Sequence, residues 1–366
     1  SLYQLMASLR DGSQPLSEAA CFLTLPDLFN HWLTGARVSE LTAASTTQCL
    51  DPVSRTWAAD LLGALGLPTA MFPAVIEPGT RLGTVLPAVA AEHGLGALTV
   101  VAPACHDTAS AVAGTPLRDP GAAYLSCGTW SLVGVEVERP VTTPAALRGN
   151  FTNEGGVGGT YRLLRNVMGL WLLEESRRAW QRSGRIPDDA SYDSLLAAAA
   201  VAPPFACVFD PDDPRFLPPG DMPARIRAAA AERGQRLPDE PGAIARAILE
   251  SLALRYRWVL LRLEELTGRT VTVVHLVGGG SRNALLCQLT ADVCGRTVLA
   301  GPVEATSIGN ALVQALAARR IGTLAEGREL VRRSFPLRSF EPRSGPEHAE
   351  AYGRFTAIVE GGAPAG

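Results

Sequence analysis

Apolar and polar positions follow two periods along the chain, one helical and one extended. Apolar residues three and four apart predict helices over 22–33, 57–65, 168–180, 243–267, 283–293 and 307–318. Continuous apolar runs predict strands over 97–103, 122–126, 130–137, 271–277 and 297–300. Because only small residues separate 122–126 from 130–137, we expect these two runs to form a hairpin. Strands that alternate with helices indicate an α/β protein, and the hairpin indicates a mixed sheet.

Turn-forming residues gather at 114–121. We therefore expect a domain boundary there, with one domain over 1–115 and a second over 116–366. A chain of 366 residues can support two cores, and its hydrophobic fraction of 47% and charged fraction of 19% indicate a folded globular protein. The net charge of −3 gives no support to a nucleic-acid partner, and no apolar run reaches the length of a membrane span.

Cysteine and arginine usage limits the kinds of catalytic and phosphate-binding site that the chain can contain. The 7 cysteines are scattered without CxxC pairs, which favours reduced thiols in a cytoplasmic protein. All 33 basic residues are arginine, which excludes a Walker A lysine, a Schiff base and a Ser–Lys nucleophile. Any phosphate must therefore be held by backbone N–H groups, hydroxyls, arginine or a metal ion.

One carboxylate stands at a predicted strand-to-helix junction. Asp107 follows the run 97–103 and precedes the small residues Thr-Ala-Ser-Ala. Aspartate is a common helix cap, and capping alone would explain it. The start of a helix also offers free N–H groups and partial positive charge, so the same position suits a ligand-binding carboxylate.

Two turns are candidates for nucleotide binding, although each is also explained as an ordinary turn. The glycines at 278–280 follow a predicted strand and precede a predicted helix, so backbone can approach a ligand closely there. The hairpin turn around Gly128-Thr129 offers a hydroxyl and N–H groups to phosphate oxygens. A glycine-rich loop is expected over 154–159, and nothing in the sequence pairs Cys127 with His106 as nucleophile and base.

Taken together and in order, these segments closely resemble the FGGY carbohydrate kinases, most closely the branch that phosphorylates L-rhamnulose. The most specific segments are His-Asp-Thr-Ala-Ser-Ala-Val at 106–112 and Asn-Phe-Thr-Asn-Glu-Gly-Gly at 150–156. Further matching segments lie at 2–5, 25–27, 33–35, 44–48, 125–136, 166–171, 278–283 and 301–306. The resemblance runs from the first residues to about residue 320.

The resemblance implies an actin-like ATPase (ribonuclease H-like) fold of two domains, with ATP, Mg²⁺ and a sugar in the cleft between them. It implies phosphorylation of a ketose, with L-rhamnulose expected first. Asp107 matches the general base of the family, and the flanking His106 and Thr108 match sugar contacts. Asn166 matches a further sugar contact.

For ATP, the resemblance implies contacts from both candidate turns. Thr129 falls on the hairpin that meets the phosphates, and Gly279 and Gly280 fall in the turn that binds adenosine. Glu174 stands near the place where the family has a glutamine associated with ATP. A carboxylate there would repel phosphates, so we expect Glu174 to face away or to alter the nucleotide contacts.

The resemblance also has consequences for the start of the chain. Kinases of this family begin with a further segment that holds a first phosphate-binding hairpin, whereas this sequence begins at Ser1. We therefore expect a truncated first domain, and self-association through an exposed apolar sheet edge. Two other functions stay open: a kinase of a fuculose-type or xylulose-type ketose, and a non-catalytic nucleotide-binding or interaction protein.

Overall fold

The computed structural model describes residues 1–12, 16–343 and 345–361. Its contacts divide the chain into two compact units, each assembled from three stretches of sequence. Unit 1 consists of Ser1–Arg118, Glu136–Leu164 and Glu304–Ser334, and unit 2 of Asp119–Val135, Arg165–Val303 and Phe335–Gly366. The first change of unit along the chain falls after Arg118, and the two later stretches Glu136–Leu164 and Glu304–Ser334 belong to unit 1. The domains predicted over 1–115 and 116–366 stay a prediction.

Unit 1 is built from short elements around a small helical core. Its helices and strands are α1 (Leu2–Asp11), α2 (Leu25–Thr34), β1 (Val38–Glu40), α3 (Leu41–Ala44), β2 (Leu50–Asp51), β3 (Thr56–Trp57), α4 (Ala59–Ala64), β4 (Ala74–Ile76), β5 (Thr80–Thr84), α5 (Pro87–Glu92), β6 (Thr99–Ala102), α6 (Asp107–Gly114), α7 (Pro144–Arg148), β9 (Thr152–Gly155), α13 (Ala305–Ala317) and α14 (Leu324–Ser334). Single turns of 3₁₀ helix lie at Leu16–Glu18, Thr69–Met71 and Val157–Gly159. Strands β1 and β4 pair in parallel, and β5 pairs with β6 in antiparallel orientation.

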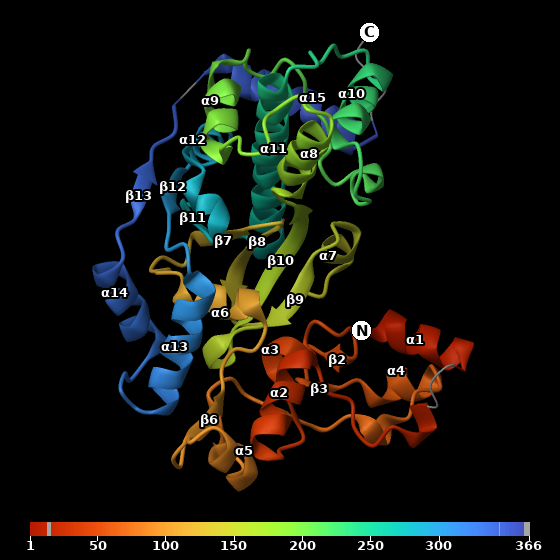
Figure 1. Cartoon of the computed structure of the whole chain (residues 1–366), viewed down its shortest axis with the longest axis vertical. Helices are drawn as coiled ribbons and strands as arrows, with labels where there is room; N and C mark the ends of the chain where they lie inside the picture. Colours follow the sequence, from red (N-terminus) through yellow and green to blue (C-terminus); the bar gives the residue numbers. More distant parts are fainter. Residues whose placement is uncertain (13–15, 344, 362–366) are drawn as a thin grey trace. The chain divides into compact units, whose positions relative to one another are not determined.

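Helices α6 and α13 cross in close contact within unit 1 (Figure 1). Small residues permit this approach, because a Cβ atom on Gly309 of α13 would lie 2.6 Å from the carbonyl carbon of Ser110 in α6. Around the crossing, Ala109, Ala113 and Val313 are buried in one apolar cluster. The small-residue run after Asp107 therefore serves helix packing, which fixes the helix that Asp107 begins.

Unit 2 contains most of the large sheet and the helices packed on it. Its helices and strands are β7 (Ala122–Cys127), β8 (Trp130–Val137), β10 (Tyr161–Met168), α8 (Trp171–Arg182), α9 (Tyr192–Val201), α10 (Met222–Glu232), α11 (Pro241–Thr267), β11 (Val273–Val277), α12 (Ala284–Cys294), β12 (Thr297–Ala300), β13 (Arg338–Phe340) and α15 (Pro346–Val359), with 3₁₀ turns at Pro214–Phe216 and Gly279–Arg282. Strands β8 and β10 run on into unit 1.

The large sheet has seven strands in the order β13-β12-β11-β7-β8-β10-β9. Strand β11 runs parallel to β7 and β12, while β7 pairs with β8 in antiparallel orientation, so the predictions of a hairpin and of a mixed sheet are both confirmed. Helix α11 packs against α8, α9, α12 and α15 (Figure 1). It is buried on several faces, including the row Ile244, Ile248 and Leu252 at four-residue spacing. In the described part of the chain, no helix combines the length and apolar character of a membrane span.

Several sequence predictions about local structure are wrong. The helix expected from residue 22 begins at Leu25, and Trp57, where another helix was expected to begin, belongs to β3. The helix expected from residue 168 begins at Trp171, because Met168 is the last residue of β10, a strand that the periodicity did not reveal. The Gly169 N–H that follows is donated to the carbonyl of Thr129 and not to a helical partner. The loop expected from residue 154 is also wrong at its start, because Glu154 and Gly155 belong to β9, paired with β10.

Candidate active site

The Asp107 carboxylate lies at the exposed start of α6. Strand β6 ends at Ala102, and the chain turns so that His106 takes the N-cap position without a capping bond from its side chain. The Asp107 side chain is 80% exposed, and its Oδ1 accepts the N–H of Thr108 at 2.6 Å. In the described residues no hydrogen bond reaches its Oδ2. A carboxylate oxygen at the positive end of a helix is thus open to a ligand.

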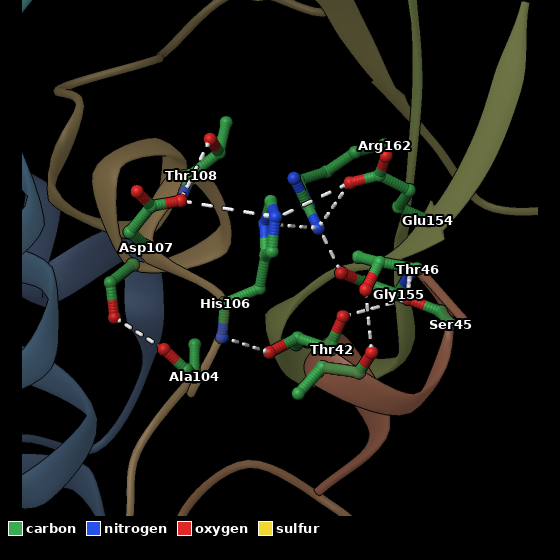
Figure 2. Close-up of polar contacts among 12 residues, drawn as sticks. Thr42, Ser45, Thr46, Ala104, His106, Asp107, Thr108, Glu154, Gly155 and Arg162 are labelled. Atoms are coloured by element: carbon green, nitrogen blue, oxygen red, sulfur yellow. Dashed lines mark hydrogen bonds and ion pairs between the residues drawn. The ribbon is translucent and has the colours of Figure 1, made fainter. Parts of the chain in front are cut away.

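The His106 ring lies between the Asp107 carboxylate and a buried ion pair (Figure 2). Its Nδ1 is 3.4 Å from Nη2 of Arg162, and its Nε2 is 3.8 Å from Oδ1 of Asp107. Burial lowers the pKa of His106, and the Arg162 charge lowers it further, while Glu154 and Asp107 act in the opposite direction. A guanidinium can only donate, so the neutral ring accepts at Nδ1 and carries its proton on Nε2, toward Asp107.

The ion pair beside His106 comes from the β9–β10 pair. Glu154 and Arg162 are direct register partners across the two antiparallel strands, and their Oε2 and Nη2 atoms are 2.9 Å apart. Both side chains are buried, and Nε of Arg162 also donates to the carbonyl of Gly155 at 3.0 Å. From the sequence, Glu154 was expected only as part of a loop, and Arg162 was not predicted as a site residue. An arginine between apolar neighbours was the available signal, whereas its partner Glu154 is brought opposite only by the pairing of β9 with β10.

Thr108 and Asn166 differ in how accessible they are. Thr108 is buried, and its hydroxyl donates to Oδ1 of Asp107 at 3.2 Å. In unit 2, Asn166 is exposed on β10. The end of its strand is held by Asp212, whose Oδ1 accepts the N–H of Met168 at 2.8 Å.

The two candidate ATP turns adjoin each other in unit 2. The β7–β8 turn exposes Thr129, whose carbonyl accepts N–H groups from Gly169 at 3.1 Å and Trp171 at 3.2 Å. The glycine turn touches the same hairpin, since a Cβ on Gly280 would lie 2.6 Å from the Cβ of Cys127. Only glycine fits there, which explains part of the glycine run on structural grounds alone. The preceding residue of the same turn, Gly279, is exposed.

The Glu174 carboxylate is hydrogen-bonded to two arginines of its own helix, α8. Its carboxylate accepts two hydrogen bonds from Arg177, both at 3.1 Å, and one from Arg178 at 3.2 Å. The hydrogen bond from Arg177 is the main cause that lowers the pKa of Glu174. The two guanidinium groups offset the negative charge that would otherwise repel a phosphate.

Metal-binding side chains are dispersed. Across residues 1–12, 16–343 and 345–361, no group of three His, Cys, Asp or Glu side chains could hold a metal ion.

Comparisons with known proteins agree with this geometry. The N-terminal domain of the FGGY family of carbohydrate kinases matches residues 9–114, and the C-terminal domain of that family matches residues 123–318. A rhamnulokinase from Pectobacterium carotovorum subsp. carotovorum (strain PC1) is 44% identical over 360 residues, which are 98% of this chain and 70% of the relative. A rhamnulokinase from Bacteroides thetaiotaomicron is 44% identical over 359 residues, which are 98% of this chain and 73% of the relative.

Solved structures give the same fold. A ligand-bound xylulose kinase from Lactobacillus acidophilus superposes with a TM-score of 0.76 at 17% identity, over 98% of this chain and 70% of that one. A glycerol kinase from Plasmodium falciparum with ADP superposes with a TM-score of 0.76 at 16% identity, over 98% of this chain and 71% of that one. Both domains match in order and the similarity spans nearly the whole sequence, so the chain belongs to the FGGY family of carbohydrate kinases, with their actin-like fold.

Proposed function

We propose that this kinase phosphorylates L-rhamnulose at its primary hydroxyl to give L-rhamnulose 1-phosphate, with Asp107 as the general base. As an FGGY carbohydrate kinase it uses ATP with Mg²⁺ to phosphorylate a sugar. The observation that carries the choice of sugar is the 44% identity over 98% of the chain to proteins named rhamnulokinase. The exposed Asp107 carboxylate at the start of α6 supports the choice of base.

The proposed step is a direct transfer. The hydroxyl oxygen of the sugar bonds to the γ-phosphorus while its proton passes to Asp107, and the bond to the β-phosphate oxygen breaks to release ADP. Mg²⁺ bound with ATP would neutralise phosphate charge in this step. The Nε2–H of His106 and the hydroxyl of Thr108 flank the carboxylate and are proposed to orient the sugar, together with Asn166.

Nucleotide contacts are proposed for the two adjoining turns of unit 2. Thr129 would meet phosphate oxygens, and Gly279 and Gly280 would lie against the adenosine. The close packing of Gly280 on the hairpin supports this, because it gives the two turns one fixed arrangement. Glu174 is proposed to lie near ATP with its charge offset by Arg177 and Arg178.

The test is a coupled assay of ADP release with L-rhamnulose, L-fuculose and D-xylulose, on the protein expressed from its complete reading frame. We expect L-rhamnulose to have the highest kcat/KM, and phosphorus NMR to find the new phosphate on the C1 oxygen. A higher kcat/KM for another ketose would refute the proposed substrate. ADP release that no ketose stimulates would contradict the kinase function itself.

A pair of variants tests the base. Asp107→Asn should lower kcat by roughly 100- to 10,000-fold while calorimetry still detects ATP binding. Asp60→Asn changes another exposed aspartate in the first turn of a helix of unit 1 and should leave kcat unchanged. Equal kcat values for the two variants would remove Asp107 from the mechanism.

A cytoplasmic location and self-association also remain proposals. All seven cysteines are free thiols, which supports a reducing compartment. On α2, Leu25, Phe29 and Trp32 are each more than half exposed, which supports association through an apolar surface. Sedimentation velocity would test the second proposal, and a single monomeric species would contradict it.

A further inference from the structure

The segment that leads into Asp107 has no sheet partner of its own. Strand β6 ends at Ala102, and α6 begins at Asp107, so residues 103–106 form a free connection. On one side this connection is tied to α6, since the hydroxyl of Ser110 donates to the carbonyl of Ala104 at 2.7 Å. On the other side it depends on two side chains from the β1–α3 junction.

Glu40 and Thr42 bind the two backbone amides immediately before Asp107. The Cys105 N–H donates to Oε2 of Glu40 at 3.0 Å, and the His106 N–H donates to Oγ1 of Thr42 at 3.0 Å (Figure 2 for His106 and Thr42). The Thr42 hydroxyl in turn donates to Oε2 of Glu40 at 2.5 Å. One connected set of bonds therefore fixes both amides.

Glu40 is itself held firmly. It is completely buried, and its carboxylate also accepts the N–H groups of Thr42 at 3.0 Å and Ala43 at 3.2 Å. Its own N–H donates to Oδ1 of Asp27 at 3.0 Å. A buried carboxylate is costly unless its oxygens are bonded, so the network favours one geometry over looser ones.

We propose that Glu40 and Thr42 are positioning residues for the phosphoryl transfer: by holding the amides of Cys105 and His106, they set the place and direction of the Asp107 carboxylate. This proposal rests on the proposed function, because it assumes that Asp107 is the base. Neither side chain touches the sugar or ATP in this role. Catalysis is sensitive to such placement, since a displacement of about 1 Å can cost on the order of 100-fold in rate.

The test compares Thr42→Val with Thr42→Ser. Valine has the shape of threonine but leaves the His106 N–H without its acceptor, whereas serine keeps the hydroxyl. We expect Thr42→Val to lower kcat by about tenfold to 100-fold, with KM for ATP unchanged, and Thr42→Ser to recover most of kcat. Hydrogen exchange of the amides of residues 105 and 106 should rise in Thr42→Val only.

Thr47→Val is the matched control. Thr47 is equally buried, and its hydroxyl likewise accepts a backbone N–H, that of Cys49 at 3.1 Å. It donates to the carbonyl of Ala44 at 2.6 Å, whereas Thr42 donates to a carboxylate. This variant should lose stability without losing kcat per folded molecule. If Thr42→Val does not fold, Glu40→Asp, which withdraws the carboxylate by one methylene, should give the same loss of kcat.

The outcomes separate this proposal from the proposed function. If Thr42→Val and Thr47→Val have equal kcat values, or if exchange at 105 and 106 is unchanged, the positioning role is wrong even when Asp107→Asn is inactive. If Asp107→Asn keeps full kcat, the proposed base is wrong. If, in addition, Thr42→Val raises the hydrogen exchange of residues 105 and 106 without lowering kcat, the positioning role is wrong together with the base.

Discussion

Gly309→Ala tests whether the crossing of α6 and α13 fixes the helix that begins with Asp107. A Cβ at this position would lie 2.6 Å from the carbonyl carbon of Ser110 and 2.9 Å from the backbone nitrogen of Gly114. The carbonyl oxygen of Ser110 lies closer still. Carbon atoms are in favourable contact at about 3.5–4.0 Å, so the two backbones must separate by more than about 1 Å. Because the opposing atoms are backbone, no side chain can rotate to make room.

The free energy of unfolding should fall in spite of the better helix propensity of alanine. Overpacking of this kind costs about 1–3 kcal/mol, and separation of the helices also loosens contacts of Ala109, Ala113 and Val313. Alanine regains only about 1 kcal/mol by helix propensity. We therefore expect Gly309→Ala to be destabilised by up to about 2 kcal/mol, with a lower kcat because the start of α6 shifts.

Gly353→Ala provides the matched control for this experiment. Gly353 lies inside α15, and an added Cβ would meet no atom of the described chain within 4 Å. Propensity alone should act there and stabilise the protein by about 0.5–1 kcal/mol. Urea unfolding followed by circular dichroism measures both variants. If Gly309→Ala were as stable as Gly353→Ala, the close crossing would not constrain the two helices and the reasoning would be refuted.

Three further predictions concern buried groups. Burial raises the pKa of Glu250 from 4.5 to about 7, so its ionisation destabilises the fold as pH rises. In urea unfolding, the free energy of unfolding of Glu250→Gln should rise by about 3 kcal/mol relative to wild type between pH 4 and 8, and a difference that does not change with pH would contradict this. Gly280→Ala should weaken ATP binding in calorimetry, because its Cβ would lie 2.6 Å from a side-chain carbon of the β7–β8 hairpin and displace that turn. An added Cβ on Gly279 would meet open space, so Gly279→Ala should stay as stable as wild type. Arg162→Met should cost about 3–5 kcal/mol in denaturant unfolding by leaving buried Glu154 unpaired, and adding Glu154→Gln should restore part of it; no recovery would argue against the ion pair as the cause.

Hydrophobic pattern predicted most of the sheet and little of what surrounds Asp107. Strands 130–137 and 297–300 have the predicted bounds, since both are apolar runs enclosed by turn residues. Strand β10 was not predicted, because Arg162, Arg165 and Asn166 interrupt its apolar run. Its arginine at 162 is buried only because Glu154 faces it across the β9–β10 pair, and no local pattern encodes such a partner.

The candidate site was predicted from the resemblance and not from spacing, for the same reason. Glu40 and Cys105 are 65 positions apart in the sequence and meet only through tertiary structure. A buried glutamate beside a short strand has no periodicity that would distinguish it from a surface residue. Sequence reasoning could therefore find the carboxylate at a helix start, but it could not find the side chains that hold the segment before it.

The bonds around Asp107 bear on its two interpretations, as a helix cap and as the proposed base. A capping aspartate stands at the N-cap and accepts an N–H group two or three residues further along the helix. Here His106 is at the N-cap, and Asp107 accepts the N–H and the hydroxyl of the next residue, Thr108, both at Oδ1. Glu40 and Thr42 accept the amides of Cys105 and His106, which precede the helix. In the described residues no hydrogen bond reaches Oδ2, which lies at the positive end of α6, where a base would have access to its substrate. The Asp107 carboxylate therefore does not make the usual N-cap bond, which supports the proposal that it acts as the base.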